Sequence, residues 1–202
     1  MNSKSLITGN IADLLTDWGE LAIDSNLADG VLKDIPILGS LVKLYKSGEN
    51  VREHLFSKKV EKIIKNMSGV SEEEVSKFNY QINSDPEYRT KVAEHLTLLI
   101  DRLDDIDKSE FLAKAFIGFS TNRVDFNKFK RLARAIERCM VEDLREVHNF
   151  ERANDAYSDI TADLAACGLI EMVQLPQVAR DDVKPMYKIS KFGELFVKVV
   201  LI

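Results

Sequence analysis

The stretch VSEEEVSKFNYQINSDPEYRTKVAEHLTLLIDRLDDIDKSEF, residues 70–111, contains three helix starts in succession. Ser71 and Glu74 have the spacing of a capping box, in which each side chain accepts a hydrogen bond from the other residue's backbone N–H. A second start follows at residues 84–87, where SDPE places a proline in the first helical turn. Asp107 and Glu110 form a third, box-like start. Together these starts predict an array of helices.

Apolar residues recur at helical spacing on both sides of this stretch. Before it, Asn10 can cap a first helix, Pro36 suits the first turn of a second, and residues 51–67 carry a third helical pattern. After it, a helix is expected from about residue 125, and its apolar stripe from Phe129 to Val147 spans about five turns, which predicts a single long helix over 125–147. We therefore expect a helical domain over residues 1–150.

The pattern changes in residues 151–202. A helix ends near Cys167 and Gly168, where glycine can adopt the left-handed cap. A strand over 169–175, a polar loop and a returning strand over 186–190 then lead into a last helix. Helix, strand, loop, strand and helix in this order resemble a winged-helix module. The predicted fold class is thus mainly α, a multi-helix domain followed by a small winged-helix-like α+β module with one β-hairpin.

The ending "L-x-x-x-G-L-I … Y-x-I-S-x-F-G-E-L-F" at residues 164–196 also resembles the tail of the Abi-alpha family of bacterial abortive-infection proteins. These proteins likewise place a helical region before it. The resemblance covers about 40 residues and rests on hydrophobic spacing together with Gly168 and Gly193. It implies a bacterial setting and a part in defence against phage, and it carries no functional residue over to this chain.

The composition is that of a globular chain with a well-solvated surface, because 45% of the residues are hydrophobic and 30% are charged. The N-terminal sequence MNSKSLITGN lacks the apolar run of a secretory signal. The longest apolar cluster, residues 35–42, is far shorter than the roughly 20 residues that a membrane span needs. We therefore expect a cytoplasmic protein with no membrane span.

Charge is segregated along the chain. Residues 43–65 hold seven basic residues against three acidic ones, residues 123–138 hold six against two, and residues 72–110 hold five against eleven. The basic helices can simply face the acidic segment or solvate the surface; alternatively, they form a basic face for RNA, anionic lipid or an acidic partner. The candidate binding residues are Lys58, Lys59, Lys62, Lys130, Arg131, Arg134 and Arg138.

The winged-helix resemblance raises DNA binding, in which the helix before the hairpin would enter the major groove. Here Asp155, Asp159 and Asp163 recur along that helix and place three carboxylates on one face. DNA phosphates would repel this face. Residues 151–202 also hold six basic residues against eight acidic ones, and the net charge of the chain is −5. We therefore favour protein contacts for this module over nucleic acid.

One catalytic pattern provides an alternative function. Arg89 and His95 match the R-x(4–6)-H pattern of HEPN ribonucleases. These enzymes resemble this chain in being helical, and they are common in bacterial defence. On a continuous helix, however, the two side chains point about 120° apart. We expect Arg89 to cap the helix or to pair with a nearby carboxylate such as Glu87. An RNA-cleaving protein is thus an alternative to the favoured function.

The sequence predicts no cofactor and no metal site. The three histidines lie far apart, and the acidic cluster at residues 101–110 lacks the glycine of a calcium loop. Cys139 lies on the apolar stripe and is expected to be a small buried hydrophobe, and with Cys167 it makes neither a disulfide framework nor a metal cluster. The favoured function is a non-enzymatic interaction or regulatory protein with a protein partner or a second copy of itself.

The end of the chain, FVKVVLI over residues 196–202, has six apolar side chains and one lysine. A disordered tail is normally polar, because only burial compensates for the entropy lost on ordering. We expect this segment to pack within the chain against the hairpin and against Ile160 and Leu164, with an interface to a second subunit as the alternative.

Overall fold

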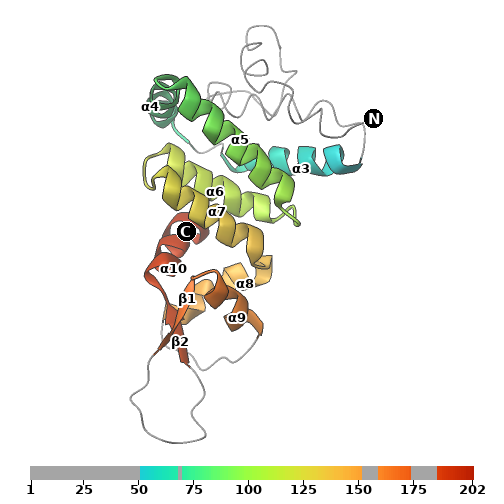
Figure 1. Ribbon diagram of the computed structural model, residues 1–202, viewed down its shortest axis with the longest axis vertical. Helices are drawn as coiled ribbons and strands as arrows, with labels where there is room; N and C mark the ends of the chain where they lie inside the picture. Colours follow the sequence, from blue (N-terminus) through green and yellow to red (C-terminus); the bar gives the residue numbers. More distant parts are fainter. Residues whose placement is uncertain (1–50, 68–69, 152–158, 174–185) are drawn as a thin grey trace, which may run out of the picture. The chain divides into compact units, whose positions relative to one another are not determined.

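The computed structural model describes residues 51–67, 70–151, 159–173 and 186–202 (Figure 1). These residues are mainly helical and include one two-stranded antiparallel sheet near the C-terminus, which confirms the predicted fold class. They gather into two compact units, of which the first ends at Ala113 and the second begins at Lys114. The division expected at residue 150 stays a prediction. The helices expected to begin at Asn10 and Pro36 lie outside the described residues.

The first unit contains α3 (Val51–Asn66), α4 (Glu72–Asn83), α5 (Pro86–Arg102) and the beginning of α6 (Lys108–Ser120). The predicted capping box is present: the Ser71 hydroxyl accepts from the Glu74 N–H, and the Glu74 carboxylate accepts from the Ser71 N–H. Asp85 caps α5 by accepting from the Tyr88 N–H, with Pro86 in the first turn. Local chemistry therefore fixes both starts.

The core of the first unit forms where α5 contacts α3 and α4. Its fully buried side chains include Val60, Ile63 and Met67 of α3, Ile82 of α4, and Val92, Leu96 and Ile100 of α5. At the surface, Arg52 of α3 binds Asp101 of α5 through two hydrogen bonds, Nε to Oδ1 at 3.2 Å and Nη2 to Oδ2 at 2.5 Å. The apolar pattern expected over residues 51–67 is thus confirmed from Val60 onward, whereas Leu55 is 42% exposed.

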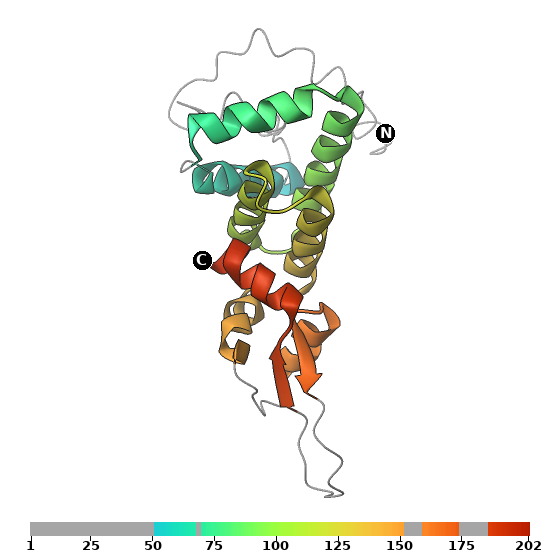
Figure 2. The same cartoon turned by 90° about the vertical axis from the view of Figure 1, so that its left-hand side faces the viewer.

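The second unit holds the rest of α6, followed by helices and one hairpin. Its elements are α7 (Phe126–Arg138), α8 (Val141–Glu146), the 3-10 turn η2 (Val147–Glu151), α9 (Asp159–Ala166), β1 (Ile170–Val173), β2 (Met186–Ile189), α10 (Lys191–Phe196) and the π-helical turn η3 (Val197–Leu201). Ile170 pairs with Ile189, and Val173 pairs with Met186. Figure 2 shows the two strands side by side. Both predicted strands are confirmed, although residues 174–175 lie outside the described part.

The single long helix expected over residues 125–147 is wrong. α7 ends at Arg138, Cys139 is extended with φ −88° and ψ 154°, and Met140 is also extended before α8 begins. The apolar stripe continues across this break because both segments bury their apolar side: Ile136 and Leu144 have no exposed surface. No glycine or proline marks the break, so the sequence contains no stop signal at this position.

Two glycines of the second unit are required by the fold, Gly168 for its backbone conformation and Gly193 for a close approach. Gly168 has φ +74°, the left-handed conformation predicted for the residue that ends α9. Gly193 lies in α10 so close to the hairpin that an added Cβ would be 2.0 Å from the backbone oxygen of Leu169. Ser190 caps α10 by accepting from the Gly193 N–H at 2.9 Å. These contacts fix α10 against the start of β1.

The C-terminal turn packs within the second unit, where Val199 lies against Gly118 of α6; its expected packing against Ile160 and Leu164 stays a prediction. Phe196 and Val200 have no exposed surface, and a Cβ added to Gly118 of α6 would lie 2.6 Å from Cγ1 of Val199. Ile202, in contrast, is 92% exposed. The apolar end of the chain therefore has a packed part and a free last residue. No helix in the described ranges is long and apolar enough to cross a membrane.

Candidate functional site

α7 has two sides of opposite character. Its buried side consists of Phe129, Leu132, Ala133, Ala135 and Ile136. Arg131, Arg134 and Arg138 lie on the exposed side, and at about 100° per residue they span roughly 60° around the helix axis. We call these three residues the arginine strip. The sequence had marked all three as candidate binding residues, and the fold places them on one strip.

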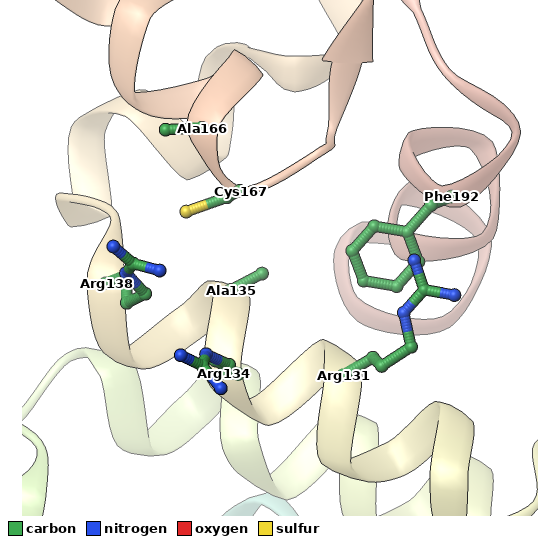
Figure 3. A pocket seen from close by; sticks show the side chains of 7 residues that line it. All are labelled: Arg131, Arg134, Ala135, Arg138, Ala166, Cys167 and Phe192. Atoms are coloured by element: carbon green, nitrogen blue, oxygen red, sulfur yellow. The ribbon is translucent and has the colours of Figure 1, made fainter.

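A small pocket lies beside the arginine strip (Figure 3). Its walls are Arg131, Arg134, Ala135 and Arg138 of α7, Ala166 and Cys167 at the end of α9, and Phe192 of α10. The volume of about 110 Å³ is enough for one small group such as a carboxylate or a few water molecules. The pocket therefore combines charged guanidinium groups with the apolar side chains of Ala135, Ala166 and Phe192.

The arginine strip gathers three positive charges on one side of α7. Arg131 is held by a cation–π contact, with its guanidinium carbon 4.6 Å from the centroid of the Phe192 ring. Within the part of the chain that the structure describes, no carboxylate lies within ion-pair distance of Arg131, Arg134 or Arg138. Three neighbouring cations that have no ion-pair partner among the described residues repel one another and attract an anion. The pocket is thus suited to bind a negatively charged group.

The other basic residues marked by the sequence have different surroundings. Lys130 of α7 is half-buried, with its ammonium 5.0 Å from the centroid of the Phe126 ring. In the first unit, Lys58 is exposed, and Lys62 forms an ion pair with Asp107 at 2.5 Å. None of the three lines the pocket.

Lys59 of α3 has a structural role. Its ammonium donates to the backbone carbonyls of Ile100 and Leu103, at 3.2 Å and 2.5 Å, and so satisfies the end of α5. Burial lowers the pKa of Lys59, and the nearby Asp101 carboxylate opposes that shift. A lysine committed to these carbonyls does not contribute to a free basic face.

Arg89 and His95, the pair behind the nuclease alternative, both lie in α5 and are half-buried. Arg89 donates from Nη1 to the side-chain oxygen of Asn83 at 3.2 Å, which is an amide partner in place of the expected carboxylate. Nε of Arg89 and Nε2 of His95 are both buried. A general base needs a nitrogen that its substrate can reach, so this placement adds no support to the nuclease alternative.

The helix before the hairpin carries no basic residue in its described part. α9 has the sequence DITADLAA, in which Asp163 is exposed. Of the three predicted acidic positions, Asp155 lies outside the described residues, and the side chain of Asp159 is also not described. On α8, burial raises the pKa of the Asp143 carboxyl, and the Asp163 and Glu142 carboxylates raise it further. Acidic residues therefore gather at the first turn of α8 and in the middle of α9.

Comparisons with known proteins show no relationship: no family model matches the chain, and no curated protein or solved structure matches it. The winged-helix and Abi-alpha resemblances thus rest on the pattern of residues 164–196 alone. Among the described residues, no group of three or more histidine, cysteine or acidic side chains could hold a metal ion. The arginine strip with its pocket is the site that the structure offers for interpretation.

Proposed function

We propose that this chain is a non-enzymatic interaction protein that binds an acidic segment of a partner protein at the arginine strip. The observation that carries the proposal is the set of three exposed arginines beside a pocket, with no ion-pair partner among the described residues. Guanidinium groups recognise carboxylates through paired hydrogen bonds, which are about twice as strong as bonds between neutral groups.

The pocket fits one acidic side chain better than a larger anion. A carboxylate of glutamate or aspartate entering the volume of about 110 Å³ would meet the guanidinium groups, while its methylene carbon would lie against Phe192, Ala135 and Ala166. Further acidic residues of the same segment would occupy the rest of the strip. The ligand class is therefore a peptide segment with several neighbouring carboxylates.

A protein partner suits the surrounding charge better than nucleic acid. Duplex binding depends on many lysines and arginines that neutralise phosphates. Here α9 has no basic residue in its described part, Glu142 and Asp163 are exposed, and the whole chain has a net charge of −5. Nucleic acid is the second candidate, favoured only by the arginine strip itself.

Two further parts of the proposal concern setting and partner. The resemblance of residues 164–196 to Abi-alpha proteins supports a bacterial, cytoplasmic protein that acts in defence against phage.

A second copy of the chain is also a source of an acidic segment, because residues 72–110 contain eleven acidic residues. Sedimentation of the protein alone, compared with the Arg134→Gln/Arg138→Gln variant, separates self-association from binding to another protein.

The test uses the full chain, a fluorescein-labelled oligoglutamate peptide and fluorescence anisotropy. We expect Arg134→Gln/Arg138→Gln to weaken binding at least about tenfold, because each lost charged hydrogen bond is worth about 1.5–3 kcal/mol. The matched control, Lys91→Gln/Arg102→Gln, removes the same charge from exposed positions of α5 and should bind like the native chain.

Two results would contradict the proposal. Equal weakening in both double variants would show that overall charge, and not the arginine strip, attracts the peptide. Tighter binding of labelled duplex DNA or single-stranded RNA than of the peptide, lost in the arginine variant, would replace the protein partner by nucleic acid.

A further inference from the structure

The two cysteines of the chain meet in the second unit although they are 28 positions apart. Sγ of Cys139 lies 2.9 Å from Sγ of Cys167, and both are free thiols. A disulfide bond is about 2.05 Å long, so the sulfur atoms need to approach by less than about 1 Å to be joined. The break between α7 and α8 produces this contact, because it leaves Cys139 in an extended conformation at the end of α7.

The two thiols differ in access. Cys139 has no exposed surface, whereas Cys167 is half-buried and lines the pocket. Figure 3 shows the Cys167 side chain in the pocket wall together with the arginines of α7. A reagent from solvent therefore reaches Cys167 first and reaches Cys139 only through it.

The surroundings also give the two sulfur atoms different chemistry. Cysteines next to cationic side chains react readily as thiolates, and Cys167 shares its pocket with three arginines. The hydrogen bond to Cys167, followed by burial, raises the pKa of the Cys139 thiol, and the Asp163 and Asp143 carboxylates add to this effect. These surroundings favour the protonated thiol at Cys139.

We propose that Cys167 and Cys139 form a reversible intramolecular disulfide, and that the arginine strip directs anionic low-molecular-weight disulfides to Cys167. This inference does not depend on the proposed protein partner, because oxidation is measured on the chain alone. It assigns a modification site to two residues that the sequence had suggested form no disulfide framework, with Cys139 as a small buried hydrophobe.

The reaction is a thiol–disulfide exchange in two steps. The Cys167 thiolate attacks one sulfur of the reagent; a protein–reagent disulfide forms, the reagent's own S–S bond breaks, and one reagent thiolate leaves and takes up a proton. Cys139 then loses its proton and attacks Sγ of Cys167, which releases the second reagent thiol. The protein thiols lose two electrons and two protons, and the reagent disulfide is reduced to two thiols.

The first experiment follows the intact mass and the free thiols of the reduced full chain during incubation with glutathione disulfide. We expect both thiols to disappear with a mass loss of two hydrogen atoms, and dithiothreitol to restore them. Cys139→Ala should stop as a glutathione adduct on Cys167, and Cys167→Ala should react far more slowly. A stable glutathione adduct or a disulfide-linked dimer of the native chain would overturn the proposal. This result is read on the native chain, so it decides the proposal even where a cysteine variant does not fold.

The second experiment tests the part played by the arginines. Glutathione disulfide is anionic and cystamine is cationic, so the ratio of their initial rates reports electrostatic steering toward Cys167. We expect this ratio to fall at least about tenfold in Arg134→Gln/Arg138→Gln and to stay unchanged in Lys91→Gln/Arg102→Gln. A ratio that is the same in all three proteins would show that the arginines do not direct the reagent. Failure of the oligoglutamate peptide to bind would leave both rate measurements intact, so the two proposals fail separately.

Discussion

The guanidinium carbon of Arg131 lies 4.6 Å from the centroid of the Phe192 ring, so a residue of α10 holds a residue of α7 in position. An arginine side chain on a helix surface normally samples many rotamers, and a ligand that orders it bears an entropy cost of about 0.5–1.5 kcal/mol. Stacking on the ring reduces that cost before any ligand arrives. Phe192 is therefore a positioning residue for the arginine strip and a wall of the pocket.

The first prediction concerns this ring. Phe192→Leu should weaken oligoglutamate binding about threefold, because a cation–π contact at a partly exposed site is worth about 0.5–1 kcal/mol. Phe192→Tyr keeps the ring face and should bind like the native chain. Fluorescence anisotropy measures both affinities, and circular dichroism checks that both variants remain folded. Weakening of equal size in the two variants would show that the ring face does not position Arg131.

The second prediction concerns pH and the buried carboxyl of Asp143. Burial and the neighbouring Asp163 and Glu142 carboxylates raise its pKa in the folded chain. A carboxyl with a raised folded-state pKa lowers stability while it is charged, and this loss disappears as pH falls through the folded pKa. Asp143→Asn should therefore raise the melting temperature at neutral pH, and this gain should shrink as the pH is lowered toward the unfolded-state pKa.

The control for this prediction is Glu142→Gln, which removes a carboxylate that is exposed on the same helix. Its effect on the melting temperature at neutral pH should be smaller than that of Asp143→Asn. A gain for Asp143→Asn that does not depend on pH would show that packing of the amide, and not removal of a buried charge, is responsible.

Local signals predicted the helix starts correctly, and they failed where the fold depends on distant contacts. The capping box at Ser71 and the Asp85 cap involve residues within one turn, so their spacing alone reveals them. The break at Cys139 has no such signal, because it arises where α8 turns to bury Leu144 while the stripe of α7 stays buried. Because the helical spacing of apolar residues continues through the break, the sequence wrongly predicts a single helix.

The candidate site shows the same contrast between residues that local sequence reveals and residues that only distant contacts bring together. Arg131, Arg134 and Arg138 could be selected from the sequence because residues 123–138 hold six basic residues against two acidic ones. Phe192 and Cys167 could not be added, since α9, the hairpin and α10 must first fold back onto α7. Lys59 was selected as a binding residue, but its carbonyl partners lie more than forty positions away in sequence and are visible only in the fold.

The last prediction concerns the apolar end of the chain, where Val200 and Ile202 lie two positions apart in opposite surroundings. Val200 has no exposed surface, whereas Ile202 is 92% exposed. Val200→Ala removes two buried methyl groups and should reduce the free energy of unfolding by about 1–3 kcal/mol, through lost burial and the cavity left behind. Ile202→Ala removes apolar atoms from a side chain in solvent and should change the free energy of unfolding by less than about 0.5 kcal/mol. Urea denaturation followed by circular dichroism measures both values. Deleting residues 196–202 removes Phe196 and Val200 together and should cause aggregation. A deleted chain that stays monomeric with the native melting temperature, or equal effects of the two alanine variants, would show that this turn does not stabilise the second unit.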